Sequence, residues 1–216
     1  MLLVKDSMTR EVVALSPRTT AAEALAACRE GRVRHLPVLE GGRLVGIVSD
    51  RDLRSAAPPL GDPERAAALE KIELSEVMTS DVVTTRPDDP IEEAANTMRE
   101  KRIGCLPVVE DGALVGILTS SDVMEALVQL VGAHEPGSRL VTSMPDRPGT
   151  LAGVAGIFGV LGINIVSVVA GTRREPPPGE QGPWRAAIFR IDTIDPSEAI
   201  ELLERAGYSV LWPPKP

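Results

Sequence analysis

Two stretches of the chain each end in a hydroxyl residue with an aspartate three positions later. HLPVLEGGRLVGIVSDRDL (35–53) ends in Ser49 and Asp52, and CLPVVEDGALVGILTSSDV (105–123) ends in Thr119 and Asp122. At a helix start this spacing forms a capping box, in which each side chain accepts a backbone N–H of the other residue. A helix start can also bind phosphate through its N–H groups, and a carboxylate can accept both hydroxyls of a ribose. The residue types alone favour the cap, and the two roles are compatible.

The elements that position these residues occur twice. Met78 lies 70 residues after Met8, and at this offset 20 of the 48 residues from 6 to 53 are identical to their partners. Each copy predicts a short strand, a helix, a hairpin and a second helix. The strands are Val12–Leu15 and Val82–Thr85, the first helices are 21–30 and 91–100, and the second helices begin at Asp50 and Ser120. One copy is too small to bury its sheet, so we expect the second copy to supply the missing layer.

The turn of each hairpin has residues that accept positive φ angles. The first turn is Gly41-Gly42 and the second is Asp111-Gly112. Glycine and aspartate in these positions are typical of a tight two-residue hairpin. Both turns therefore predict a tight hairpin.

The composition excludes several classes of protein. Of 216 residues, 43% are apolar and 25% are charged, which is typical of a globular chain, and the net charge of −8 argues against a nucleic-acid partner. Two histidines far apart in the sequence offer little to a metal site, and Cys28 and Cys105 stand in apolar surroundings that favour buried, reduced thiols over a disulfide. The sequence contains no nucleophile–base pair, metal cluster or phosphate loop, so we predict no catalysis.

One uncharged stretch, LAGVAGIFGVLGINIVSVVAGT at residues 151–172, is long enough to span a bilayer. Its middle holds the helix-stop signal GIN, and the β-branched run after it is typical of a buried strand. A helix followed by a strand is therefore the better interpretation. We expect a cytoplasmic protein with no membrane association.

The opening MT, the LPV strand and the GIVSDRD and GILTSSD endings resemble the cystathionine-β-synthase (CBS) domain pair over about residues 3–130. The resemblance implies two units about a pseudo-twofold axis and two clefts that bind adenine nucleotides (AMP, ADP or ATP) or related adenosyl ligands. It gives the hydroxyls of Ser49 and Thr119 to phosphate and the carboxylates of Asp52 and Asp122 to ribose. The binding residues that it implies at the two helix starts are Ser49, Asp50, Arg51, Asp52, Thr119, Ser120, Ser121 and Asp122.

The two copies differ in charge. Arg34 and His35 precede the first LPV, where phosphate-binding members of the family often place basic residues, whereas Gly104 and Cys105 precede the second. The resemblance thus implies two clefts of different electrostatics, and we predict that the site receiving Arg34 and His35 prefers a di- or triphosphate. The alternative is that both residues are ordinary polar surface.

The last third predicts strands and helices in the order βαββαβ, the ferredoxin-like arrangement. Its helix over 150–161 should bury a stripe that includes Leu151, Val154 and Phe158. The segment DRPGTLAGVAGIFGVLGINI resembles the ACT domain, which often senses amino acids between paired copies. The resemblance implies a site at Asp146, Gly149 and Asn164, although some amino-acid-binding members carry Asn where Asp146 stands. The alternative is that Asn164 is only a turn residue and that the domain only dimerises.

Taken together, the chain resembles CBS–ACT regulatory proteins of the acetoin-utilisation type. We expect an α/β (α+β) fold with CBS repeats at 3–54 and 74–130 and an ACT domain at 138–213. The expected function is a non-catalytic sensor of an adenine nucleotide, with no catalytic cofactor or metal. Its partners would be small ligands, a second copy of the chain and a regulated partner enzyme. A partner-docking dimer with vestigial clefts is the alternative, and an unrecognised enzyme is less favoured.

Overall fold

The computed structural model describes residues 2–59, 61–176, 179 and 181–214. The chain forms two compact units, Met1–Ala126 and Leu127–Pro216. Strands and helices alternate in both, so the mixed α/β class expected from the sequence is confirmed.

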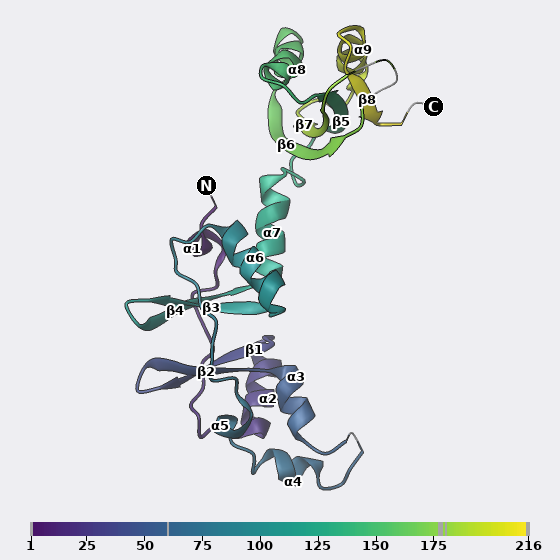
Figure 1. Cartoon of the computed structure of the whole chain (residues 1–216). Coiled ribbons are helices and arrows are strands. Elements are labelled where there is room, and N and C mark those ends of the chain that lie inside the picture. The colour runs from purple at the N-terminus through teal and green to yellow at the C-terminus, as the bar shows by residue number, and fades with distance from the viewer. Residues whose placement is uncertain (1, 60, 177–178, 180, 215–216) are drawn as a thin grey trace. The chain divides into compact units, whose positions relative to one another are not determined.

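Two antiparallel hairpins form the centre of the first unit, and Figure 1 shows them one above the other. Strand β1 (His35–Glu40) pairs with β2 (Arg43–Ser49), and β3 (Cys105–Glu110) pairs with β4 (Ala113–Thr119). The residues of both turns have positive φ angles, with Gly41 at 56° and Asp111 at 50°. The predicted hairpins are confirmed, and β2 and β4 end at the hydroxyl residues of the two capping boxes.

Helices cover these hairpins in two lobes. In the first lobe, α2 (Ala21–Glu30) and α3 (Asp50–Ala56) pack with β1 and β2, and α4 (Arg65–Leu69) follows in the connector. In the second lobe, α6 (Ile91–Lys101) and α7 (Ser120–Leu130) take the corresponding places. Each lobe has its own buried core, with Leu36 and Leu53 in the first and Leu106 and Leu118 in the second.

The first segment of each repeat packs in the lobe of the other repeat. The short helix α1 (Val4–Ser7) and Met8 belong to the core of the second lobe, whereas α5 (Leu74–Val77) and Met78 pack in the core of the first. Isolated bridges join Thr9 to Ile117 and Thr79 to Ile47.

Two glycines allow this exchange. A Cβ on Gly46 would lie 2.4 Å from the Sδ atom of Met78, and one on Gly116 would lie 2.6 Å from the Sδ atom of Met8. Each methionine therefore fills the space that a side chain would need. The lobes do not coincide with the sequence repeats, because each lobe takes its first turn from the other repeat.

The short strands predicted at Val12–Leu15 and Val82–Thr85 are wrong in extent. Only the last residue of each segment pairs, Leu15 with Val38 and Thr85 with Val108, in isolated parallel bridges. The remaining residues of both segments belong to no strand. Val12, Val13, Val82 and Val83 instead line the two clefts described in the next section.

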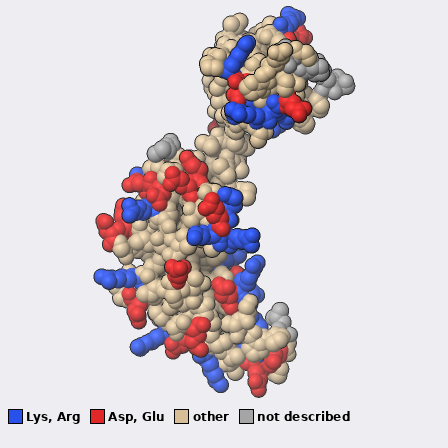
Figure 2. Space-filling view, in the orientation of Figure 1, with Lys and Arg blue, Asp and Glu red and all other residues tan. Residues whose placement is uncertain are grey.

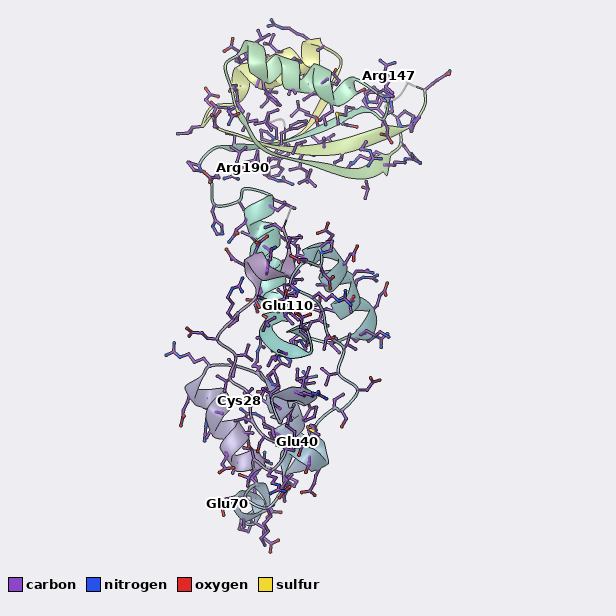
Figure 3. The ribbon with its side chains drawn as sticks, turned by 90° about the vertical axis from the view of Figure 1, so that its left-hand side faces the viewer. Cys28, Glu40, Glu70, Glu110, Arg147 and Arg190 are labelled. Carbon is purple, nitrogen blue, oxygen red and sulfur yellow. The ribbon has the colours of Figure 1, made fainter. Side chains whose placement is uncertain are left out.

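The second unit has four antiparallel strands in the order β6-β7-β5-β8, which is the ferredoxin-like arrangement expected from the sequence. Figures 1 and 3 show its two helices on one face of this sheet. In chain order the elements are β5 (Ser138–Pro145), α8 (Thr150–Val160), β6 (Ile165–Arg174), β7 (Trp184–Ile191), α9 (Ser197–Arg205) and β8 (Ser209–Trp212).

The core of this unit lies between the helices and the sheet. Phe158 of α8 and Phe189 of β7 are fully buried, with their ring centroids 5.4 Å apart in an edge-to-face contact. Val154 is buried as predicted, but Leu151 is 44% exposed, so its place on the buried stripe was wrong. The uncharged stretch at 151–172 divides into α8 and β6, and no helix among the described residues is long and apolar enough to cross a membrane.

Candidate ligand-binding clefts

Both Ser/Thr-x-x-Asp endings form capping boxes. In the first box, the backbone N–H and the hydroxyl of Ser49 donate to Asp52 Oδ2 at 3.0 and 2.6 Å, and the Asp52 N–H donates to Ser49 Oγ at 3.2 Å. In the second, Thr119 donates in the same way to Asp122 at 2.7 Å twice, and receives the Asp122 N–H at 3.4 Å. Each hydroxyl therefore donates its proton to the aspartate of its own box. It could donate to a phosphate oxygen only after that proton turned outward.

The first box opens onto a cleft of about 460 Å³ between the two lobes, which we call cleft A. One wall comes from the first lobe and carries Arg34, His35 and the helix start at Ser49–Asp52. The opposite wall comes from the second repeat and carries Asp81, Val82, Val83, Arg102 and Ile103. The walls combine apolar side chains with charges of both signs, as small-molecule sites generally do.

A second cleft of about 510 Å³, cleft B, lies beside the other helix start. Thr119, Ser120 and Ser121 line one side of it. The first repeat supplies the opposite wall, with Glu11, Val12, Val13, Arg32 and Val33.

The repeat offset relates the two clefts. Arg102 of cleft A corresponds to Arg32 of cleft B, and both residues have left-handed backbones, with φ of 56° and 51°. Asp81 likewise corresponds to Glu11. Sequence reasoning passed over these four residues, although the ungapped repeat placed an arginine and an acid at matching positions in both copies.

Arg34, His35 and Gly104 line both clefts. A Cβ on Gly104 would lie 3.3 Å from the Cε1 and Nε2 atoms of His35, so the imidazole lies against the glycine backbone. The sequence suggested that Arg34 and His35 serve one site. The structure places them where the two clefts share a wall.

The structure brings most of the predicted binding residues to the clefts. Ser49, Asp50, Arg51, Asp52, Arg34 and His35 line cleft A, and Thr119, Ser120, Ser121, Arg34 and His35 line cleft B. Asp122 is absent from the residues that line cleft B, and its carboxylate is held in the part-buried cap. The pseudo-symmetric carboxylates thus have different surroundings.

Burial controls the charge of two groups at these walls. It lowers the pKa of His35, and Arg34 lowers it further against the opposing effect of Asp50 and Asp52, so the imidazole is neutral near pH 7. Burial raises the pKa of the Cys105 thiol to about 12, so this side chain of cleft A is also uncharged. The charges that a ligand meets therefore come from arginines and carboxylates.

In the second unit, Asp146 already has cationic partners. Arg185 forms a fork with its two carboxylate oxygens, at 3.1 Å each, and Arg173 Nε lies 3.3 Å from Oδ2. The Arg185 hydrogen bonds hold the pKa of Asp146 below its usual range. A ligand amine would have to displace one of these guanidinium groups.

Within one copy of the second unit, the residues that were predicted to form a ligand-binding site lie at opposite ends of the sheet. Asp146 and Gly149 follow the end of β5 where Pro145 pairs with Trp184, whereas Asn164 precedes β6 where Ile165 pairs with Ile191. Figure 3 shows the same separation through Arg147 and Arg190, which lie toward opposite ends of the sheet. These residues can share a site only across two copies.

The chain belongs to the CBS domain family, whose model matches residues 4–58 and 74–129, and residues 138–207 match the model of the ACT domain. The order of the matched regions is that expected from the sequence.

Relatives and solved structures match the CBS part. A CBS domain-containing protein of Dictyostelium discoideum is 33% identical, over 63% of this chain and 99% of its own length. A Vibrio cholerae protein assigned to acetoin utilization (AcuB) is 36% identical, with a TM-score of 0.53 over 63% of this chain and 99% of that chain. The CBS domain pair of protein MJ0100, in complex with 5′-methylthioadenosine and S-adenosyl-L-methionine, is 29% identical, with a TM-score of 0.52 over 60% of this chain and 98% of that chain.

Some matched relatives are enzymes, but the similarity covers a small part of each. A homoserine O-acetyltransferase of Methanohalobium evestigatum is 34% identical over 56% of this chain and only 23% of the enzyme. Such a match shows a shared CBS pair and carries no evidence for the enzyme's activity in this chain.

Proposed function

We propose that this protein is a non-catalytic regulatory sensor that binds adenosyl ligands in clefts A and B. The observation that carries the proposal is the pair of pseudo-symmetric clefts, each with a helix start, an arginine in a left-handed turn and an opposing acid. Their volumes suit an adenosyl compound, since small-molecule sites range from about 300 to 1,000 Å³. The adenosyl ligands of the MJ0100 pair support this choice of ligand class.

The residues proposed to contact ligand differ in role. Val82 and Val83 in cleft A, and Val12 and Val13 in cleft B, offer apolar surface to an adenine ring. Asp52 can accept ribose hydroxyls in cleft A through Oδ1, which has no partner among the described residues. Arg34, Arg102 and Arg32 would meet the anionic part of a ligand.

A thermal-shift screen tests this function. AMP, ADP, ATP, S-adenosyl-L-methionine and 5′-methylthioadenosine should be compared with guanosine and cytidine nucleotides at equal concentration. A ligand at 100 times its Kd should stabilise the chain by about 2.7 kcal/mol and raise the melting temperature. If no adenosyl compound shifts the melting temperature at millimolar concentration, the sensor proposal fails and a docking role with vestigial clefts remains.

We also propose that the chain forms a homodimer. Four apolar residues toward the end of α7 or just after it, Met124, Leu127, Leu130 and Val131, are between 39% and 65% exposed. Met124, Leu127 and Leu130 follow one another at three-residue spacing in α7, and exposed apolar residues at helical spacing favour an interaction surface. Light scattering at micromolar concentration should give twice the chain mass, and Leu127→Glu should shift the mass toward one chain. A monomeric wild-type protein would contradict the proposal.

A second candidate concerns the second unit, which would bind a small ligand such as an amino acid or only join subunits. The ion pairs of Asp146 favour the joining role, because its carboxylate is already satisfied. Adding the twenty amino acids to the same screen distinguishes the two, since only a ligand-binding domain would respond.

A further inference from the structure

The two clefts have similar volumes and differ in the balance of the charged residues that line them. Cleft A is lined by three arginines, Arg34, Arg51 and Arg102, and by three aspartates, Asp50, Asp52 and Asp81. Cleft B is lined by two arginines, Arg32 and Arg34, and by one acidic residue, Glu11. With His35 neutral, cleft A balances its charges and cleft B has an excess of one cation.

The difference comes from the helix starts. Asp50 and Arg51 of α3 correspond to Ser120 and Ser121 of α7, so the charges of cleft A are replaced by hydroxyls in cleft B. Asp52 is among the residues that line cleft A, whereas Asp122 is not among those that line cleft B. Arg102 and Arg32 occupy corresponding positions in the two clefts, so they do not account for the difference in charge.

The arginines of both clefts are available to a ligand. Arg32, Arg34, Arg51 and Arg102 form no ion pair within the part of the chain that the structure describes. Of the carboxylates in cleft A, Asp50 lies 3.6 Å from Arg54, which is not part of the lining. The carboxylates of Asp52 and Asp81 have no cationic partner among the described residues.

We propose that the clefts divide adenosyl ligands by the charge of the tail. Cleft A takes an adenosyl compound whose tail carries both an ammonium or sulfonium cation and a carboxylate, and cleft B takes a phosphorylated adenosine. This inference rests on the proposed sensor function and specifies which ligand each cleft selects. The chain would then compare two different ligands instead of binding the same one twice.

The physical reason is electrostatic complementarity. A polyphosphate in cleft A would face Asp50, Asp52 and Asp81 at short range, and repulsion between like charges is strong where water is partly excluded. A tail with both signs of charge finds a partner for each, with carboxylates for its cation and the arginine forks for its carboxylate. In cleft B the phosphate meets Arg32, Arg34 and the hydroxyls of Ser120 and Ser121, with only Glu11 opposed.

Arg32 and Arg102 offer a matched pair of variants. Arg32→Asn and Arg102→Asn each remove one guanidinium from one cleft, and asparagine tolerates the left-handed backbone that both positions require. Calorimetric titrations of the full chain with ATP and with S-adenosyl-L-methionine should show that wild type binds both at once. Arg32→Asn should lower the affinity for ATP at least tenfold and leave that for S-adenosyl-L-methionine within twofold, and Arg102→Asn should do the reverse.

Ser121→Asp provides a second test that does not endanger folding. It adds a carboxylate to cleft B in the first turn of α7, where an acidic residue favours the helix, so the variant should fold at least as well as wild type. Its affinity for ATP should fall at least tenfold. Asp50→Ser removes an acidic residue from the lining of cleft A and should let ATP bind there as a second equivalent.

The outcomes distinguish a failure of the proposed sensor function from a failure of the proposed division of ligands. Failure of every adenosyl compound to bind wild type would remove the sensor function itself. Binding of ATP and S-adenosyl-L-methionine in mutual competition would overturn the division of ligands and leave the sensor function standing. An equal loss of both ligands in Arg32→Asn and in Arg102→Asn would overturn it as well.

Discussion

The imidazole of His35 lies against the backbone of Gly104, so close that a methyl group on the glycine would be 3.3 Å from two ring atoms. Both residues line clefts A and B. The two clefts therefore share a wall. Figure 2 shows acidic and basic side chains interspersed over the face of the first unit that it draws.

Gly104→Val should weaken ligand binding in both clefts. The Cβ alone would lie 3.3 Å from two ring atoms of His35, which is tighter than an ordinary van der Waals contact. The larger valine side chain must therefore displace the His35 ring or enter a cleft. We expect at least a tenfold loss of affinity for ATP and for S-adenosyl-L-methionine by calorimetry. If only one ligand loses affinity, the wall is not shared in function.

The two capping aspartates should separate stability from binding. Asp52→Ala and Asp122→Ala each remove a cap and should each lower the free energy of unfolding by about 0.5–2 kcal/mol. Only Asp52 lines a cleft, so only its variant should also lose more than tenfold in ligand affinity, equal to about 1.4 kcal/mol. Denaturant unfolding and calorimetry on both variants test this, and an equal effect on binding would contradict it.

The glycines under the exchanged methionines should resist substitution. Gly46→Ala and Gly116→Ala should each cost about 1–3 kcal/mol in unfolding free energy, because the new Cβ overlaps a methionine side chain. In a Met78→Ala background, Gly46→Ala should cost much less, since its three nearest atoms all belong to Met78.

Gly116 should differ in the same double-mutant test. A Cβ on Gly116 would also lie 3.1 Å from the carbonyl oxygen of Thr9, and backbone yields less than a side chain. Met8→Ala should therefore relieve only part of the cost of Gly116→Ala. Full relief at both sites would show that the methionines alone set the constraint.

Acidification should lower the unfolding free energy, because the folded chain holds the pKa of His35 below its ordinary value. Its folded-state pKa is lower than its ordinary value of about 6.5, so below that pH the unfolded chain binds a proton that the folded chain does not. This contribution to stability is complete above pH 6.5 and is lost as the pH falls through the folded pKa. Arg34, Asp50 and Asp52 are the charged groups that act on the ring.

His35→Gln removes this titration and keeps a polar side chain at the wall. The unfolding free energy of the variant, measured in denaturant at several pH values, should fall less steeply than that of wild type just below pH 6.5. Parallel curves would mean that His35 does not titrate differently in the folded chain.

Local signals in the sequence predicted much of the fold. Gly41-Gly42 and Asp111-Gly112 indicated both hairpins because positive φ angles restrict the residues that a tight turn can hold. Ser49 and Asp52 indicated the helix start because the cap is complete within four residues. Such features depend on neighbours in the chain, and so the chain sequence is enough to find them.

Features that depend on the other lobe were not predicted. Nothing in the repeat distinguishes an arrangement in which Met8 packs in its own lobe from one in which it packs on Gly116. The sequence predicted a strand over Val12–Leu15, but only Leu15 pairs, in an isolated bridge with Val38. In the same way, Asp52 and Asp122 look equivalent in sequence, but only Asp52 is among the residues that line a cleft.

The exchange of first segments also determines the order in which the two lobes can fold during translation. Leu74 and Met78 reach the first lobe soon after its hairpin has left the ribosome, so that lobe can close early. Val4 and Met8 must instead wait about 100 residues for Leu106 and Leu118, which is on the order of 5–20 s at usual translation speeds. During this interval their apolar side chains have no core to enter. The second lobe is consequently the one that could accept the first segment of a neighbouring nascent chain, and crowded polysomes would be the place where such exchanged dimers arise.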